Sequence, residues 1–219
     1  MGLIKDFIDF VLHLDVRLPQ LVNDIGVWTY LIMFALIFCE TGLVVIPFLP
    51  GDSVIFVIGV LSHDGKLNLF AMMVVLMAAA IIGDTVNYHI GKAFGHKLFK
   101  NPDAKLFKKK YLDKTHEFYE RHGGKTIIIA RFVPIIRTFA PFVAGMGSMS
   151  YVKFISFNII GGISWVILFL FAGFFFGSIS FVKNNFTFVI FAIIFISLLP
   201  GLITYLNSRR TVKINKTKK

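Results

Sequence analysis

The sequence has few of the residues that soluble proteins place at their surfaces. Only 16% of its 219 residues are charged, and 12 Asp and Glu stand against 23 Lys and Arg. A single cysteine, Cys39, excludes a disulfide within the chain. Hydrophobic residues make up 56% of the chain, 26 residues are phenylalanine, and the mean hydropathy is +0.76. Because soluble domains are about 45–50% apolar, this composition indicates a polytopic membrane protein built as one domain.

Motifs for metal binding and nucleophilic catalysis are also missing. No pair of its six histidines has metal-ligand spacing with other donors, and no GxSxG sequence occurs. No Ser–His pair lies in the apolar segments. We therefore expect no metal, no cofactor and no catalytic residue, which favours a transporter over an enzyme.

The net charge of +11 is concentrated in two places. Segment 92–125 carries a net charge of +6, the tail 207–219 carries another +6, and the remainder sums to −1. Positive charge beside membrane spans is retained in the cytoplasm, so both segments are predicted to be cytoplasmic. Contact with anionic lipid headgroups is a plausible secondary role. Nucleic-acid binding is not expected, since no recognition motif accompanies the lysines.

Prolines divide two of the apolar stretches. Residues 25–62 would measure about 57 Å as one straight helix, nearly twice the hydrocarbon thickness of about 30 Å. Pro47, Pro50 and Gly51 interrupt this stretch, which favours a hairpin that enters and leaves on one side. Residues 126–147, broken by Pro134 and Pro141, form a second candidate hairpin.

The predicted fold is an all-α polytopic membrane protein with one domain, residues 1–219. Its segments are, in order, an amphipathic helix (1–24), a re-entrant hairpin (25–62), a transmembrane helix (67–91), the basic cytoplasmic segment (92–125), a second re-entrant hairpin (126–147), two transmembrane helices (152–178 and 186–206) and the basic cytoplasmic tail (207–219). The charges predict that the two hairpins open to opposite sides, so that a hairpin and its following span repeat in inverted orientation. Inverted repeats with broken helices are typical of secondary transporters.

Five ionisable residues lie inside these apolar stretches. Each costs about 2.5–3.5 kcal/mol to insert at the centre of a bilayer, so membrane proteins keep them mostly for function. The five are Glu40, Asp52, Asp84, Arg131 and Arg137.

Glu40 and Asp52 lie on either side of the break at Gly51. Burial disfavours the charged form of a carboxylate, which predicts that these two acids take up protons. For Asp52 a structural alternative is open, because Asp commonly caps a helix such as one starting near Ser53.

Arg131 and Arg137 lie six residues apart, about 240° around an unbroken helix. Pro134 breaks the helix between them, and this would allow both guanidinium groups to reach one cavity. Arginine presents paired donors that suit a phosphate oxyanion. The alternative is that each arginine forms a fixed buried salt bridge with Glu40 or Asp52.

Asp84 and Tyr88 are four residues apart and share one face of the span 67–91, near Gly91. A hydrogen bond between helices would explain the pair structurally, and a supporting role at the site would explain it functionally. The sequence leaves both open.

Three motifs in this order resemble the DedA family of bacterial inner-membrane proteins, which belongs with the VTT or SNARE-associated Golgi protein group. The motifs are ETGLVVIPFLPGDS at 40–53, GDTVNYHIGK at 83–92 and ARFVPIIRTFAPFVAGMGSM at 130–149. The resemblance implies a fold of two re-entrant hairpins, each followed by a span. It also implies that function depends on Glu40, Asp52, Arg131 and Arg137.

The same resemblance implies lipid transport linked to the proton-motive force and to envelope integrity. The leading hypothesis is a flippase for undecaprenyl phosphate or another lipid phosphate, with Arg131 and Arg137 binding the phosphate. Glu40 and Asp52 would couple protons, while Asp84, Tyr88, Pro134 and Gly51 would support the site. Alternatives are a phosphatidylethanolamine or other phospholipid flippase, an intramembrane prenyl-pyrophosphate phosphatase, and a proton-coupled antiporter. Homo-oligomerisation is left open.

Overall fold

The computed structural model describes residues 14–43, 51–98, 123–147 and 149–177, with scattered positions between 179 and 195. These residues form helices and no strand, so the prediction of an all-α fold is confirmed for them. In chain order the helices are α2 (Leu14–Ile25), α3 (Trp28–Gly42), α4 (Gly51–His63), α5 (Leu69–Leu98), α7 (Lys125–Ala130), α8 (Pro134–Met146) and α9 (Tyr151–Phe176).

Several predicted features lie outside the described residues. They are the start of the amphipathic helix, the breaks at Pro47 and Pro50, most of the basic segment 92–125, the basic tail, and the span 186–206 apart from scattered positions. What can be compared is therefore the central part of the chain, from α2 to α9.

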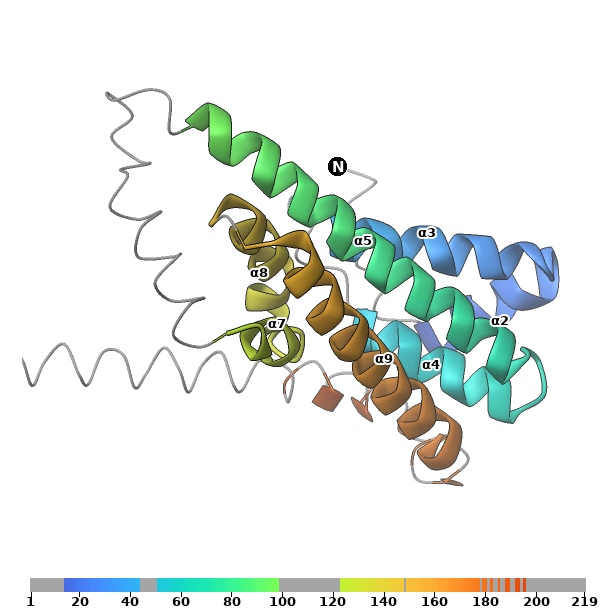
Figure 1. The fold of residues 1–219 in the computed structure, drawn as a ribbon. Coiled ribbons are helices and arrows are strands. Elements are labelled where there is room, and N and C mark those ends of the chain that lie inside the picture. The colour runs from blue at the N-terminus through green and yellow to red at the C-terminus, as the bar shows by residue number, and fades with distance from the viewer. Residues whose placement is uncertain are drawn as a thin grey trace, which may run out of the picture.

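Two of the described helices are long and apolar enough to cross a membrane. Leu69–Phe94 of α5 and the whole of α9 contain 26 residues each. At 1.5 Å per residue each measures about 39 Å, against about 30 Å for the hydrocarbon core. They lie where the sequence predicts spans at 67–91 and 152–178, and they run antiparallel (Figure 1).

Helices α3 and α4 are short by comparison. Their 15 and 13 residues measure about 22 and 20 Å, less than the hydrocarbon thickness. α4 is buried at every position from Gly51 to Ser62. A helix that is apolar all round belongs in a protein or membrane interior, and α4 forms part of the main core with α2, α3, α5 and α9.

The chain breaks between α7 and α8, as Pro134 predicts. Val133 is extended (φ −121°, ψ 105°), which the residue before a proline favours, and Pro134 then occupies the first turn of α8. Pro141 behaves differently, because it lies inside α8 without ending it. The expectation that Pro141 also breaks this stretch was wrong.

Two helix pairs approach each other closely through glycine. α4 packs along α9 and α8 packs along α5. Gly59 and Gly173 form the first contact, Gly91 and Gly145 the second, and a side chain at any of the four would meet the backbone of the partner helix. α3 also packs on α5 and α7 on α9. The shorter helices α3, α4, α7 and α8 therefore pack against the two long helices α5 and α9.

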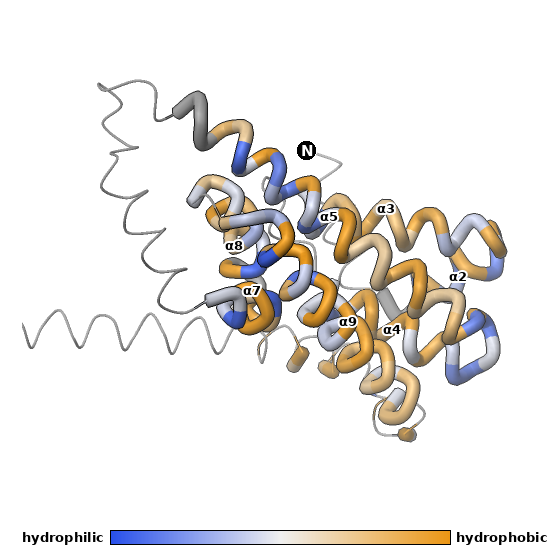
Figure 2. Tube along the Cα trace, in the orientation of Figure 1, coloured by the Kyte–Doolittle hydropathy of each residue, from blue (hydrophilic) through white to orange (hydrophobic). Residues whose placement is uncertain are grey.

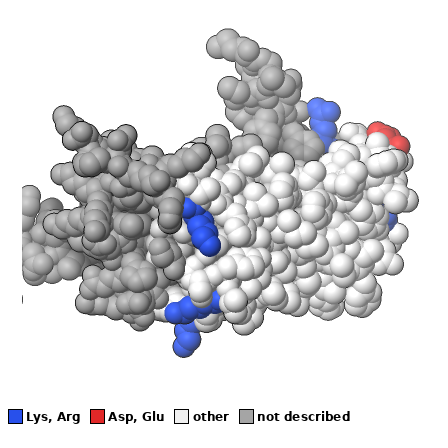
Figure 3. All heavy atoms as spheres, turned by 45° about the horizontal axis from the view of Figure 1, so that its top comes forward, with Lys and Arg blue, Asp and Glu red and all other residues white. Residues whose placement is uncertain are grey.

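The outer surface is largely apolar. Phe70, Val74, Val152 and Phe175 are each more than 60% exposed. In Figure 2 the turns at one end of the helices and the later part of α5 at the other are hydrophilic, and the helices between them are mostly hydrophobic. Figure 3 shows a wide area without charged side chains between the few that appear toward the ends. An apolar belt between polar ends is the pattern expected of a protein surrounded by lipid.

Candidate functional site

The five ionisable residues singled out in the sequence are all buried. Their exposed fractions are 1% for Glu40, 8% for Asp52, 2% for Asp84, 2% for Arg131 and 4% for Arg137. They come from α3, α4, α5, the break before α8, and α8 itself. The structure arranges them in two neighbouring groups, each built around one arginine.

The first group, called the Arg137 cluster, consists of Arg137, Glu40, Asp52 and Trp165. Arg137 Nη1 donates to Asp52 Oδ1 at 2.7 Å, and Arg137 Nη2 donates to Glu40 Oε1. Asp52 Oδ1 also accepts the indole N–H of Trp165 at 2.8 Å. The guanidinium carbon of Arg137 lies 4.7 Å from the Trp165 ring centroid, within the range of a cation–π contact.

Helix ends hold the two acids of this cluster in place. Asp52 lies in the first turn of α4, where the helix dipole favours a negative charge. Glu40 lies in the last turn of α3, and its Oε1 accepts the backbone N–H of Gly51 at 3.2 Å. The last turn of α3 and the first turn of α4 thus bring two carboxylates to one guanidinium group.

The second group, called the Arg131 cluster, joins α5, α7 and α9. Arg131 Nη2 donates to Asp84 Oδ2 and, at 2.5 Å, to Asn158 Oδ1. Asn158 Nδ2 in turn donates to the carbonyl of Ile81 at 3.0 Å. Gly162 leaves room for the arginine, since a Cβ there would lie 3.1 Å from Arg131 Nη1.

The salt-bridge alternative raised from the sequence holds for Arg137 but not for Arg131. Arg137 takes both Glu40 and Asp52, whereas Arg131 pairs with Asp84. Trp165 lies between the groups, with the guanidinium carbon of Arg131 6.0 Å from its ring centroid. The two arginines are therefore neighbours with separate carboxylate partners.

Tyr88 contacts neither cluster directly through its hydroxyl. It donates that hydroxyl to the carbonyl of Met149 and stacks on Phe154, with ring centroids 4.5 Å apart. It therefore ties α5 to the start of α9 instead of pairing with Asp84.

Sequence reasoning missed three buried polar side chains. Asn158 and Trp165 belong to the clusters described above, and Asn87 donates to the carbonyls of Thr41 and Thr138 at 3.0 and 2.8 Å. Asn87 thereby links the end of α3 to α8. The available signal was an amide inside an otherwise apolar span, which is also costly to bury unpaired.

The two clusters together hold three carboxylates and two guanidinium groups. Several buried polar atoms of these residues have no hydrogen-bond partner among the described residues: Glu40 Oε2, Asp84 Oδ1, Arg137 Nε, Arg131 Nε and Arg131 Nη1. The same holds for Ser53 Oγ in the first turn of α4. Such atoms cost about 1–3 kcal/mol each when left unpaired. They give the site unused capacity to bind protons, water or an anion. Across the described ranges no group of three or more His, Cys, Asp or Glu could hold a metal ion.

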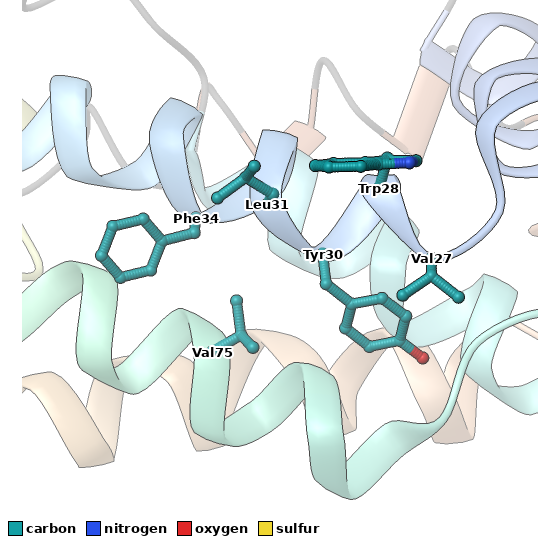
Figure 4. Close-up of a pocket in the computed structure, with 6 residues that line it drawn as sticks. All are labelled: Val27, Trp28, Tyr30, Leu31, Phe34 and Val75. Atoms are coloured by element: carbon teal, nitrogen blue, oxygen red, sulfur yellow. The ribbon is translucent and has the colours of Figure 1, made fainter.

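An apolar groove lies on the outer face, away from the charged residues. It has a volume of about 570 Å³ and is lined by Val27, Trp28, Tyr30, Leu31, Phe34 and Val75, from the start of α3 and from α5 (Figure 4). The hydroxyl of Tyr30 accepts the backbone N–H of Asn68 at 2.9 Å, which anchors its polar end at the turn before α5.

Comparison with known proteins places the chain in a family. Residues 49–175, more than half of its length, match the VTT domain. The chain is 58% identical to "Protein DedA" of Escherichia coli K12 over 212 residues, which cover 96% of this chain and 97% of that protein. This chain belongs to the DedA family. No solved structure matches it.

More distant relatives of this DedA-family chain are also named as membrane proteins. "Uncharacterized membrane protein Rv0364" of Mycobacterium tuberculosis is 44% identical over 173 residues, covering 77% of this chain and 75% of that protein. "Inner membrane protein YqjA" of Escherichia coli K12 is 30% identical over 148 residues, covering 68% and 67%. None of these names describes an enzyme.

The hydrogen bond from Trp165 to Asp52 leads to a first prediction, which concerns the stability of this DedA-family chain. Trp165→Phe keeps an aromatic ring beside Arg137 but removes the N–H that Asp52 accepts, so the free energy of unfolding should fall by about 1.5 kcal/mol. Trp28→Phe is the matched control, because Trp28 is 68% exposed and its replacement should change stability by less than about 0.5 kcal/mol. Thermal unfolding of the two variants in detergent measures the difference; equal unfolding would contradict it.

Proposed function

We propose that this chain is a proton-linked translocase that moves a lipid phosphate, with undecaprenyl phosphate as the leading substrate, across the bacterial inner membrane. The observation that carries the proposal is the Arg137 cluster. It is a buried arginine held by two carboxylates, both of which can be neutralised by protons. A guanidinium group released from carboxylates in an apolar site would bind a phosphate oxyanion strongly.

In this proposal the acids and arginines exchange partners during the cycle. Protons taken up by Glu40 and Asp52 from the outer side release Arg137, which then binds the phosphate together with Arg131. Loss of those protons toward the cytoplasm restores the carboxylates and expels the headgroup. Asp84 would hold Arg131 between cycles, with Gly51 and Pro134 shaping the breaks that bring the residues together.

The proposed architecture is an inverted repeat. One unit would be the re-entrant hairpin α3–α4 with the span α5, and the other the hairpin α7–α8 with the span α9. Three observations support it: α3 and α4 are too short to span, α5 and α9 run antiparallel, and α4 packs on α9 as α8 packs on α5. Broken helices that meet in the interior would provide the midplane site that such transporters use.

The proposed topology places segment 92–125 and the C-terminal tail in the cytoplasm. The basic charge of both supports it. The inner-membrane location is supported by the name of the relative YqjA. Expected partners are the lipid phosphate and protons, with no nucleic acid.

Transport in proteoliposomes tests the function. Wild-type protein should accelerate movement of undecaprenyl phosphate between leaflets, and an inward proton gradient should increase the rate. Arg131→Ala and Glu40→Gln should each lower the rate at least about tenfold, because each removes a charge that the cycle uses. Full rates in either variant would refute the proposal.

Parallel arms of the assay separate the alternative functions. Phosphatidylethanolamine as the transported lipid tests for a phospholipid flippase, and phosphate release from a lipid pyrophosphate tests for a phosphatase. Ion flux in vesicles that lack polyprenyl phosphate tests for an antiporter. Arg17→Ala, an exposed arginine on α2, is the control for general loss of positive charge.

A further inference from the structure

The carboxylate of Glu40 occupies a place that has the features of an oxyanion site. Its Oε1 accepts both the backbone N–H of Gly51, at 3.2 Å, and Nη2 of Arg137. Gly51 is the first residue of α4, a helix of 13 residues. Backbone N–H groups at a helix N-terminus bind anions because they lack partners within the helix and carry the positive end of its dipole. An internal anion thus already occupies such a site.

The first turn of α4 and Arg137 carry further donors that are buried and unpaired. Ser53, in the first turn of α4, has no exposed surface, and its Oγ has no hydrogen-bond partner among the described residues. Nε of Arg137 is likewise unpaired. Unsatisfied buried donors are rare in folded proteins and call for an explanation. A phosphate monoester has three terminal oxygens where a carboxylate has two, so it could engage donors that Glu40 leaves free.

Glycine at position 51 is what lets the anion come so close. A Cβ built on Gly51 would collide with the Glu40 carboxylate. The carboxylate therefore lies directly against the first peptide group of α4, which only glycine permits.

The Arg131 cluster also has buried donors without a partner, Nε and Nη1 of Arg131, but among the described residues no helix N-terminus contributes to it. Arg131 Nη2 donates to Asp84 and Asn158, which lie within α5 and α9. Of the two arginines, Arg137 is therefore the one that lies beside a helix N-terminus.

We infer that the N-terminus of α4, with Gly51 N–H, Ser53 Oγ and Arg137, forms the phosphate site of the transporter, and that Glu40 is an internal anion that competes with the lipid phosphate for it. The inference rests on the proposed function and deepens it. Other charges act on Glu40 besides Arg137: Asp52 from α4, Asp84 from α5, and Arg131 at longer range. The N–H of Gly51 donates to Glu40.

Competition predicts that neutralising Glu40 strengthens phosphate binding while it slows transport. If Glu40 leaves the site open in about one tenth of the molecules, its neutralisation should tighten binding about tenfold. A purely structural role for Glu40 predicts the opposite, because loss of structure weakens binding as well as transport.

The experiment measures binding of farnesyl phosphate to the purified full-length chain in detergent at about pH 8, where ordinary carboxylates are ionised. Glu40→Gln should bind it about tenfold more tightly than wild type, and Ser53→Ala in that background should lose at least about threefold. Asp24→Asn makes the same charge change at an exposed position of α2 and should leave affinity unchanged. Farnesol, which lacks the phosphate, should bind all variants equally.

Each result has a defined consequence. If wild type binds farnesyl phosphate and Glu40→Gln binds it no more tightly, the inference that Glu40 competes with the phosphate is overturned. The proposed function would still stand. No binding of farnesyl phosphate by any variant would overturn the proposed function and this inference with it. Competition by millimolar inorganic phosphate would assign the site to free phosphate as well as to a lipid headgroup. If Glu40→Gln fails to fold, Glu40→Asp replaces it, since the shorter carboxylate reaches Gly51 less well and should give a smaller gain in affinity.

Discussion

Arg137→Met should lower the free energy of unfolding by about 3–5 kcal/mol and abolish lipid transport. The replacement leaves the carboxylates of Glu40 and Asp52 buried without the guanidinium group that pairs with both. An unpaired buried charge is one of the few single defects that destabilise a protein to this extent. Thermal unfolding in detergent, with the yield of folded protein, measures the first effect.

A neutral version of the same cluster separates stability from transport. The triple variant Glu40→Gln, Asp52→Asn, Arg137→Met removes all three charges together, and replacing a complete buried ion group by neutral side chains is often neutral or stabilising. It should recover most of the stability lost in Arg137→Met. It should still transport no lipid phosphate, because it has neither the arginine nor the protonatable acids.

The triple variant decides whether the Arg137 cluster only holds the helices together. Normal stability with no transport shows that its charges serve the transport cycle. Normal transport in the triple variant would refute that role, and wild-type stability in Arg137→Met alone would contradict the burial argument. Arg17→Met, at the exposed arginine of α2, controls for the loss of one positive charge.

The sequence allowed the candidate residues to be found because charge is so costly inside apolar segments. Glu40, Asp52, Asp84, Arg131 and Arg137 need no structure to be noticed, and the structure buries all five. The break before α8 was equally predictable, since a proline restricts both its own backbone and that of the residue before it.

Partner choice could not be predicted, because it depends on how distant helices pack. Asp84 pairs with Arg131 because α9 packs against both α5 and α7, and the sequence around either residue gives no sign of that packing. Trp165 was missed for the same reason, since a tryptophan in an apolar span is unremarkable until an acid faces its N–H. Pro141 was misjudged because a proline in the interior of a membrane helix need not end it.

The close contact of α4 with α9 gives the second large prediction. Gly173→Ala should lower the free energy of unfolding by about 3 kcal/mol, because the new methyl group would meet the carbonyl of Phe56 and lie 3.1 Å from Gly59 Cα. Backbone atoms cannot rotate away as side chains do, so the two helices would have to separate. Transport should fall as well, since α4 carries Asp52 and α9 carries Trp165.

A second glycine of α9 is the matched control. At Gly161 a Cβ would find only ordinary contacts, the nearest at 3.4 Å, so Gly161→Ala should be neutral or stabilising by up to about 1 kcal/mol through helix propensity. Thermal unfolding of both variants in detergent measures the contrast, and equal stability would contradict the close-packing argument.

A double variant tests whether separation of the helices is the cause. Gly59→Ala alone should destabilise much as Gly173→Ala does, because its methyl group would lie 2.9 Å from Gly173 Cα. Residues in contact are rarely additive. Once α4 and α9 have moved apart for one methyl group, the other finds space, so Gly59→Ala with Gly173→Ala should cost clearly less than the sum of the single variants. Full additivity would mean that each methyl group causes a local defect of its own, with the helices still in contact.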